Sequence, residues 1–334
     1  MKRLTILAAA MVFAACGANK GDEFKSGLPG TDDVKMNVPA KAGAALEAEN
    51  LGTSRQALEG QTSDFYKLTR GVTVSVNGGT GFVLDLVKRI TDYPATSVSG
   101  NTAVWGPHTE ALSPNSWKLE VTKVSDTEYS YKLEGKAKND PDTAFVTILS
   151  GTHHPALDAQ GNKLEHFGNG TFSIDWDKSA TLPEHDNNVG QASFTYGRLQ
   201  PGADTTITVG FTNVKDQDTG NIISSANYKY LERSGQDGEF EFSIDKNIDS
   251  DPARSLIEHM TIKSRWLSTG LGRSDIKATG GDVGSTPATV NECWDANFVS
   301  RFEAVSWAPT DTSLNYGNAA GNCGSFTSAD YSSL

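Results

Sequence analysis

Hydrophobic residues follow two different periods along this chain, and the change falls near residue 97. Between residues 63 and 93 they recur at intervals of three to four, which is the spacing of one face of an α-helix. The pattern therefore predicts an amphipathic helix over 63–93, which Pro94 ends. Asn77-Gly78-Gly79 interrupts the apolar face, so we expect the helix to kink or divide there.

Beyond residue 97 the period changes to two, which indicates β-strands. Trp117, Leu119 and Val121, for example, alternate with polar residues, and short polar turns separate successive runs of this kind. Further strand-like runs lie at Tyr129–Glu134, Ala144–Leu149, Thr171–Trp176, Ala192–Tyr196, Thr206–Phe211, Ala226–Leu231, Glu239–Ile244, His259–Trp266 and Asn297–Trp307. Strands joined by short turns pair with their neighbours in an antiparallel meander. We expect an α+β fold that is mainly β: a meander sheet, open or partly closed into a barrel, whose apolar face the 63–93 helix covers.

Composition narrows the class of protein. The chain has 334 residues, 37% of them hydrophobic, which suffices for one large domain and excludes a wholly disordered chain. The formal net charge is −12 and there is no basic stripe, which argues against nucleic acid as a partner and equally against attachment to anionic lipid headgroups. No apolar run reaches the length of a membrane-spanning helix. We place a single mainly-β domain at 61–334.

The first sixteen residues have the layout of a cleaved secretory signal, because Lys2 and Arg3 precede a short apolar run that ends in small residues. The stretch Phe13-Ala14-Ala15-Cys16-Gly17 resembles the lipobox of bacterial lipoproteins, with Phe13 in place of the usual Leu. That resemblance implies that Cys16 becomes the N-terminus and carries acyl chains such as palmitate. The alternative is an ordinary secretory signal with a chance cysteine.

The same resemblance implies a location. Gly17 lacks the aspartate that retains enterobacterial lipoproteins at the inner membrane, so we expect the outer membrane, on its periplasmic side or at the cell surface. Acyl chains contribute about 0.8 kcal/mol per buried methylene, and two or three of them anchor a soluble domain. Residues 17–60 are rich in Gly, Ala and charged residues with no sustained period, which predicts a flexible tether.

Two cysteines remain once Cys16 is assigned to the anchor. Cys293 and Cys323 form an even pair in an oxidising compartment, so we predict a disulfide. A redox-active or metal-binding pair is the alternative, although the two cysteines lack Cys-x-x-Cys spacing.

Histidines gather in one segment of the chain. His153, His154 and His166, with Asp158 and Glu165 nearby, are weak candidates for a metal site, because imidazoles and carboxylates are zinc ligands. Their spacing matches no established ligand pattern, and a solvent-exposed polar loop is the simpler interpretation.

Other stretches have simple structural explanations. Asp216–Asn221 has alternating oxygens like part of a calcium loop but suits a hairpin turn better. Asp175 and Asp177 flank Trp176 as paired carboxylates do in glycosidases, yet half-buried strands show the same pattern. No Gly-x-Ser-x-Gly, Ser-x-x-Lys or phosphate-loop motif occurs. Trp105 and Trp117 are expected to fill the core at the helix–sheet junction, with a ligand cavity as the alternative.

These observations favour a lipid-anchored protein of the cell envelope, without enzymatic activity or cofactor, that acts by binding or as a structural component. Its organisation resembles that of bacterial lipoproteins in general, which brings no particular activity with it. The alternative is a carrier of an apolar ligand or lipid held between sheet and helix; at the level of fold this plan resembles the periplasmic lipoprotein carriers and the mycobacterial lipid-binding lipoproteins. A metal-dependent enzyme around the three histidines is the third hypothesis.

Overall fold

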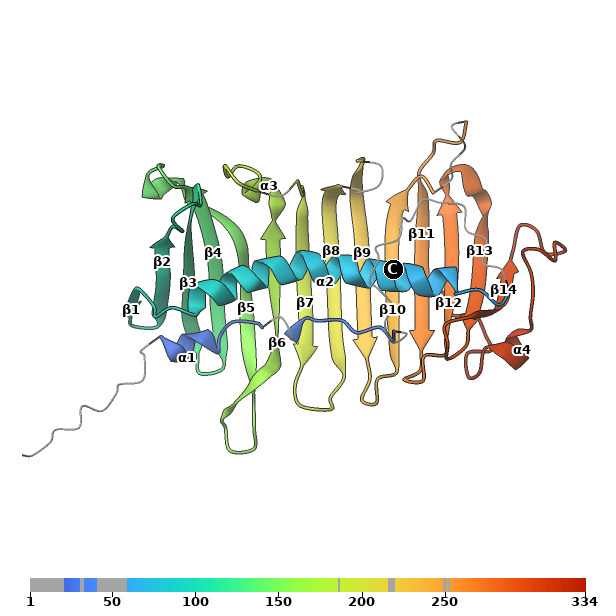
Figure 1. Ribbon diagram of the computed structural model, residues 1–334, viewed down its shortest axis with the longest axis horizontal. Helices are drawn as coiled ribbons and strands as arrows, with labels where there is room; N and C mark the ends of the chain where they lie inside the picture. The colour runs from blue at the N-terminus through green and yellow to red at the C-terminus, as the bar shows by residue number, and fades with distance from the viewer. Residues whose placement is uncertain are drawn as a thin grey trace, which may run out of the picture.

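A computed structural model describes residues 21–30, 33–40, 59–185, 187–215, 220–248, 251 and 253–334. Within them, fourteen strands form one antiparallel sheet in which every strand pairs with its neighbours in sequence (Figure 1). The strands are β1 (Ser97–Ser99), β2 (Thr102–His108), β3 (Asn115–Ser125), β4 (Glu128–Ala137), β5 (Val146–Leu157), β6 (Lys163–Asp175), β7 (Gln191–Arg198), β8 (Thr205–Lys215), β9 (Ile222–Glu232), β10 (Gly238–Lys246), β11 (Glu258–Trp266), β12 (Gly272–Gly280), β13 (Gly284–Trp294) and β14 (Ser300–Val305). The predicted antiparallel meander is confirmed, and the sheet is open.

The helical elements are few. They are α1 (Asp22–Lys25), α2 (Asp64–Thr91), α3 (Trp176–Ser179), α4 (Ala319–Asn322) and the single turns η2 (Asp142–Ala144) and η3 (Gly281–Val283). Among the residues described, none of the helices combines the length and apolar composition that a membrane span requires.

Helix α2 corresponds to the segment expected at 63–93, and it crosses the strands on one face of the sheet (Figure 1). Its 28 residues span about 42 Å at 1.5 Å per residue, whereas fourteen strands about 4.8 Å apart make a sheet about 60 Å wide. The Ser63 side chain caps its first turn by accepting a hydrogen bond from the Tyr66 N–H at 3.0 Å.

The expected division of this helix at Asn77-Gly78-Gly79 was wrong, because α2 is continuous through it. Each glycine in a helix interior costs about 1 kcal/mol, whereas each large apolar side chain that becomes buried contributes about 2 kcal/mol. Among its described side chains, the helix buries seven of this kind: Tyr66, Leu68, Val72, Val76, Leu84, Val87 and Ile90. Burial therefore outweighs the local propensity. Asn77 itself accepts a hydrogen bond from the Met36 N–H at 3.0 Å and donates one to the Met36 carbonyl at 2.9 Å.

The N-terminal stretch 21–40 differs from the flexible tether predicted over 17–60. In its described parts, Phe24, Val34 and Met36 are almost completely buried and belong to the main hydrophobic core. The two hydrogen bonds with Asn77 join this stretch to α2. Residues 21–30 and 33–40 therefore belong to the folded unit, because their scattered apolar side chains find a surface that the sequence pattern does not show. The remaining residues of the predicted tether, apart from 59 and 60, lie outside the described residues, as do Cys16 and the signal segment.

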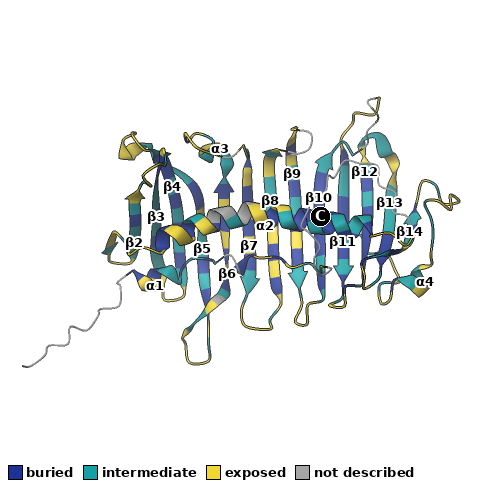
Figure 2. Ribbon diagram, viewed as in Figure 1, coloured by how far each residue is buried: buried dark blue, intermediate teal, exposed yellow. Residues whose placement is uncertain are grey.

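The space between α2 and the sheet is filled by side chains. Buried and exposed residues alternate along many of the strands, as Figure 2 shows, and the apolar residues of the main core are those on the face toward α2. The largest strand side chains of the main core that are completely buried are Trp105, Tyr129, Tyr196, Tyr228, Phe172, Phe240, Leu119, Leu133, Leu149 and Ile174. This filling determines where cavities can occur, since the centre of the interface is occupied.

The C-terminal residues cover the face of the sheet opposite to α2, over strands β10 and β12. Asp330 donates its backbone N–H to Asp275 at 3.0 Å, and the Ser332 hydroxyl donates to Glu241 at 2.6 Å. Asp275 and Arg273, which pair at 2.7 Å, are thereby buried. The predicted disulfide is confirmed: Cys293 and Cys323 are bonded, and they join α4 to β13.

The two edges of the sheet are short or covered. β1 has only three residues, and β14 exchanges backbone hydrogen bonds with Tyr316 through Glu303, at 3.0 and 3.1 Å. Short or covered edges limit pairing with other chains.

Candidate functional site

Two cavities lie on opposite sides of the last turns of α2. One, of about 790 Å³, is lined on the helix by Leu86, Arg89 and Ile90. The other, of about 690 Å³, is lined on the helix by Leu84 and Lys88, among others. Both volumes are within the range of small-molecule sites. The helix end is thus a wall shared by the two cavities.

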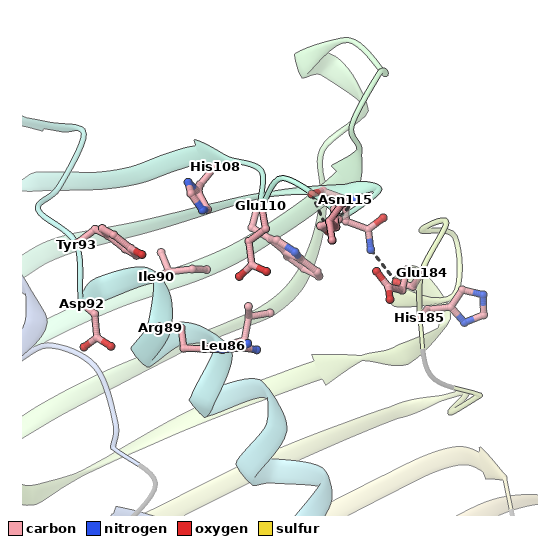
Figure 3. A pocket seen from close by; sticks show the side chains of 13 residues that line it. Leu86, Arg89, Ile90, Asp92, Tyr93, His108, Glu110, Asn115, Glu184 and His185 are labelled. Atoms are coloured by element: carbon pink, nitrogen blue, oxygen red, sulfur yellow. Dashed lines mark hydrogen bonds between the residues drawn. The ribbon is translucent and has the colours of Figure 1, made fainter.

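The larger cavity is the candidate site, and Figure 3 shows it from close by. The helix end supplies one side, the segment from His108 to Trp117 supplies another, and Glu184 and His185 close the third. In Figure 3 Glu110 lies in the middle, with Tyr93 and His108 on one side and Glu184 on the other. Three segments far apart in the sequence therefore meet here.

The apolar part of this cavity consists of Leu86, Ile90, Trp117, Tyr93 and Leu112. Leu112 is 99% exposed and Tyr93 is 65% exposed, which is unusual for large apolar side chains within one concave surface. The Tyr93 and His108 rings stack with their centroids 6.0 Å apart. A ligand that covers these side chains removes apolar area from water, worth about 25 cal/mol per Å².

Asn115 is the buried polar residue of this wall. Its side-chain amide donates to the Glu184 carbonyl at 2.7 Å, which orients the group and leaves Oδ1 as the remaining acceptor (Figure 3). In the described part of the chain, this buried Oδ1 has no hydrogen-bond partner. An unsatisfied buried acceptor costs about 1–3 kcal/mol, which a ligand donor recovers only where it reaches Oδ1.

The smaller cavity has a different wall. Besides α2 it is lined by the N-terminal stretch, including Leu28 and Asp33, and by the β5–β6 hairpin, including Pro155, Lys163 and Phe167. Lys163 donates to the Ser26 hydroxyl at 2.8 Å and to the Tyr129 hydroxyl at 2.5 Å. The N-terminal stretch, predicted as a tether, thus forms one wall of a cavity between helix and sheet.

The histidines considered as weak candidates for a metal site do not converge, and the exposed polar loop favoured for them was wrong, because they lie on strands β5 and β6. His153 is buried, and its Nδ1 lies 2.7 Å from the Tyr196 hydroxyl; His154 follows it on the strand and therefore points to the opposite face. Asp158 binds the backbone of its own turn at Gln160 and Asn162. The side chain of His166 is outside the described part, in which no group of three or more His, Cys, Asp or Glu is placed to hold a metal ion.

Burial lowers the pKa of His153 to about 4, helped by the nearby charges of His154 and Lys163. Neutral imidazole is therefore its form near neutrality, with one ring nitrogen engaged with Tyr196. A glycine on the neighbouring strand provides the room: a Cβ at Gly168 would lie 2.7 Å from the His153 ring. The simplest role of His153 is a core histidine with a satisfied hydrogen bond.

The two tryptophans considered for a ligand site have different positions. Trp105 is a core residue, 2% exposed, whose indole N–H donates to the Tyr93 carbonyl at 3.0 Å. Trp117 is half-buried and lines the larger cavity, opposite His108 in the β2–β3 register. Asp175 caps α3 by accepting from the Lys178 N–H at 3.0 Å, and Asp177 accepts from the Gly190 N–H at 2.8 Å, so both carboxylates have structural roles. Asp216–Thr219 lies outside the described residues.

A buried carboxyl pair at the other end of α2 was missed by the sequence interpretation. Glu292 on β13 and Glu303 on β14 are directly opposite in the register, on the face toward α2. Glu292 accepts hydrogen bonds from the Ser63 hydroxyl at 2.8 Å and from the Phe65 N–H at 3.0 Å, and Glu303 accepts one from Tyr316 at 3.1 Å. The two acids meet only because of the pairing register of β13 and β14. The signal for them in the sequence was the alternation of residues along each strand, which sets the face on which each acid lies.

Burial raises the pKa of both carboxyls. Burial and the nearby Glu292 charge raise the pKa of Glu303 to about 7; burial raises the pKa of Glu292, partly opposed by its hydrogen bonds. No cavity among those described opens onto them, so we assign the pair to stability and not to ligand binding.

Comparison with protein-family models, with curated proteins and with solved structures finds no significant match to this chain. The site is therefore interpreted from its own residues.

Proposed function

We propose that this protein is a lipid-anchored protein of the cell envelope whose folded domain binds a small amphipathic ligand in the cavity at the end of α2, without catalysing a reaction. The observation that supports binding is the cavity of about 790 Å³, in which exposed apolar side chains meet a polar rim and an unsatisfied buried acceptor, Asn115 Oδ1. The sequence carries none of the nucleophile motifs that we sought, which supports a binding role over catalysis.

The anchoring part of the proposal is supported by the signal layout and by the likeness of 13–17 to a lipobox. The expected product begins at Cys16 and carries two or three acyl chains that anchor it, and Gly17 after the cysteine supports the outer membrane as its location. Mass spectrometry of the N-terminal peptide of protein purified from membranes tests this. An unacylated N-terminus, or release of the protein into the soluble fraction, would contradict anchoring.

The binding part is tested with residues 17–334 secreted without the acyl chains, which retains every described residue. Native mass spectrometry with solvent extraction reads out any small molecule that copurifies. A stoichiometric ligand lost in a Leu86→Asp/Ile90→Ser variant supports the cavity as its site, provided circular dichroism shows that the variant is folded. If the same ligand stays bound to that folded variant, the cavity is not the site.

A carrier of an apolar ligand or lipid is the second candidate. It is supported by the cavity of about 690 Å³ between α2, the N-terminal stretch and the β5–β6 hairpin, whose walls include Leu28, Leu84 and Phe167. The centre of the helix–sheet interface is filled, so an acyl chain would have to lie in this lateral cavity. A copurifying lipid lost on Leu84→Trp but retained in the Leu86→Asp/Ile90→Ser variant would favour this candidate over the first.

A further inference from the structure

We infer that the cavity of Figure 3 selects a cationic amphiphile, an apolar molecule that ends in an ammonium or guanidinium group. The inference rests on the proposed binding function and specifies the class of ligand. Charge, the unsatisfied acceptor and the aromatic wall each point to this class.

The charged groups of the cavity have an acidic excess. In the net charge of the lining residues, Arg89 and Asp92, three residues apart at the end of α2, cancel each other. Glu110 and Glu184 then give the cavity a net charge of −2 when the histidines are neutral. The two carboxylates come from different segments, and in Figure 3 they lie on either side of Asn115. A cation placed near Asn115 is attracted by both, whereas an anion is repelled.

Asn115 adds a requirement for a donor. Its amide hydrogens face the Glu184 carbonyl, so Oδ1 is the atom that lacks a partner in the described part of the chain. An ammonium or guanidinium group supplies N–H donors, whereas a carboxylate or a quaternary ammonium supplies none. A primary amine or a guanidine whose N–H reaches Oδ1 therefore fits this wall better than a fully alkylated cation.

The apolar wall fits the rest of such a ligand. Trp117 and Tyr93 line the cavity, and Leu86 and Ile90 are the apolar residues on its helix side. Aromatic faces attract cations in addition to apolar groups. A cation at the carboxylates with its alkyl or aryl body against these residues satisfies both parts of the cavity.

The test compares three probes of equal chain length, octylammonium, octanoate and octanol, below their micelle concentrations. Binding to residues 17–334 is measured by isothermal titration calorimetry. The indole N–H signal of Trp117, assigned by its loss in Trp117→Phe, reports on the cavity in two-dimensional NMR. We expect octylammonium to bind at least about tenfold more tightly than octanol, to shift the Trp117 signal, and to weaken as salt is added.

The Glu110→Gln/Glu184→Gln variant is expected to lose about fivefold in octylammonium affinity for each carboxylate removed. The matched control is Asp126→Asn/Asp140→Asn, which removes two exposed carboxylates from turns outside the cavity and is expected to bind like the parent. Equal binding of the three probes at Trp117, or tighter binding of octanoate, refutes the proposed ligand class but not the proposed binding function. If no probe shifts the Trp117 signal, both the ligand class and the proposed binding function are refuted.

Discussion

The buried pair Glu292–Glu303 gives the most precise prediction for this fold. The unfolded chain ionises Glu303 around its ordinary pKa of 4.5, whereas burial and the charge of Glu292 raise the pKa of Glu303 in the folded protein to about 7. Between these values the folded state binds more protons than the unfolded state. Stability contributed by this group is therefore fully present below pH 4.5 and is lost as the pH rises through 7.

The magnitude follows from the same two pKa values. A difference of one unit corresponds to 1.36 kcal/mol, so the shift of Glu303 is worth about 3 kcal/mol of unfolding free energy. Glu303 is only 4% exposed, which leaves little solvent screening. The substitution Glu303→Gln removes the charge, keeps the shape, and leaves an acceptor for the Tyr316 hydroxyl.

The assay is chemical denaturation followed by circular dichroism at pH 4.5, 6, 7 and 8. Relative to Glu303→Gln, the parent is expected to lose about 3 kcal/mol between the lowest and highest pH. The difference between the two proteins removes contributions from distant groups such as His153. Glu59→Gln, an exposed acid, serves as the control and is expected to follow the parent. A constant difference between parent and Glu303→Gln across this range would refute the reasoning.

Three further perturbations test other parts of the structure. Burial lowers the pKa of His153 to about 4, so the stability contributed by its neutral form is present above its ordinary pKa of 6.5 and is lost as the pH falls through 4. We expect His153→Gln to remove up to about 3 kcal/mol of that pH dependence in the same denaturation assay. Unchanged acid sensitivity of the variant would contradict this. Asn77→Ala removes both hydrogen bonds to Met36 and is expected to cost about 1–3 kcal/mol, with hydrogen exchange accelerated at Met36 and Asn37 but not in β8. Replacing both Cys293 and Cys323 by Ala opens a loop of about 30 residues and is expected to cost about 3–4 kcal/mol; a thermal midpoint equal to that of the parent would show that the bond contributes nothing.

The regular parts of this protein could be predicted from sequence because they depend on short periods. Alternation along each strand and short polar turns are local, and they predict an antiparallel meander without knowledge of distant residues. The Cys293–Cys323 bond followed from counting cysteines. The fold class and the boundaries of the long helix were therefore accessible, whereas the division at Asn77-Gly78-Gly79 was not correctly predicted, since local propensity omits the burial that α2 gains on the sheet.

The candidate sites depend on contacts that no local pattern contains. Phe24 and Met36 are scattered apolar residues in a polar segment, and only the finished sheet and α2 show that they are core residues. Glu292 and Glu303 meet because of the β13–β14 register, while adjacent His153 and His154 separate because a strand alternates its faces. The cavity beside the last turns of α2 joins the helix, the His108–Trp117 segment and Glu184, so its position was decided by how the helix packs across the sheet. Sequence periodicity thus determined the elements, and the packing of α2 against the sheet and its neighbouring segments decided where the cavities lie.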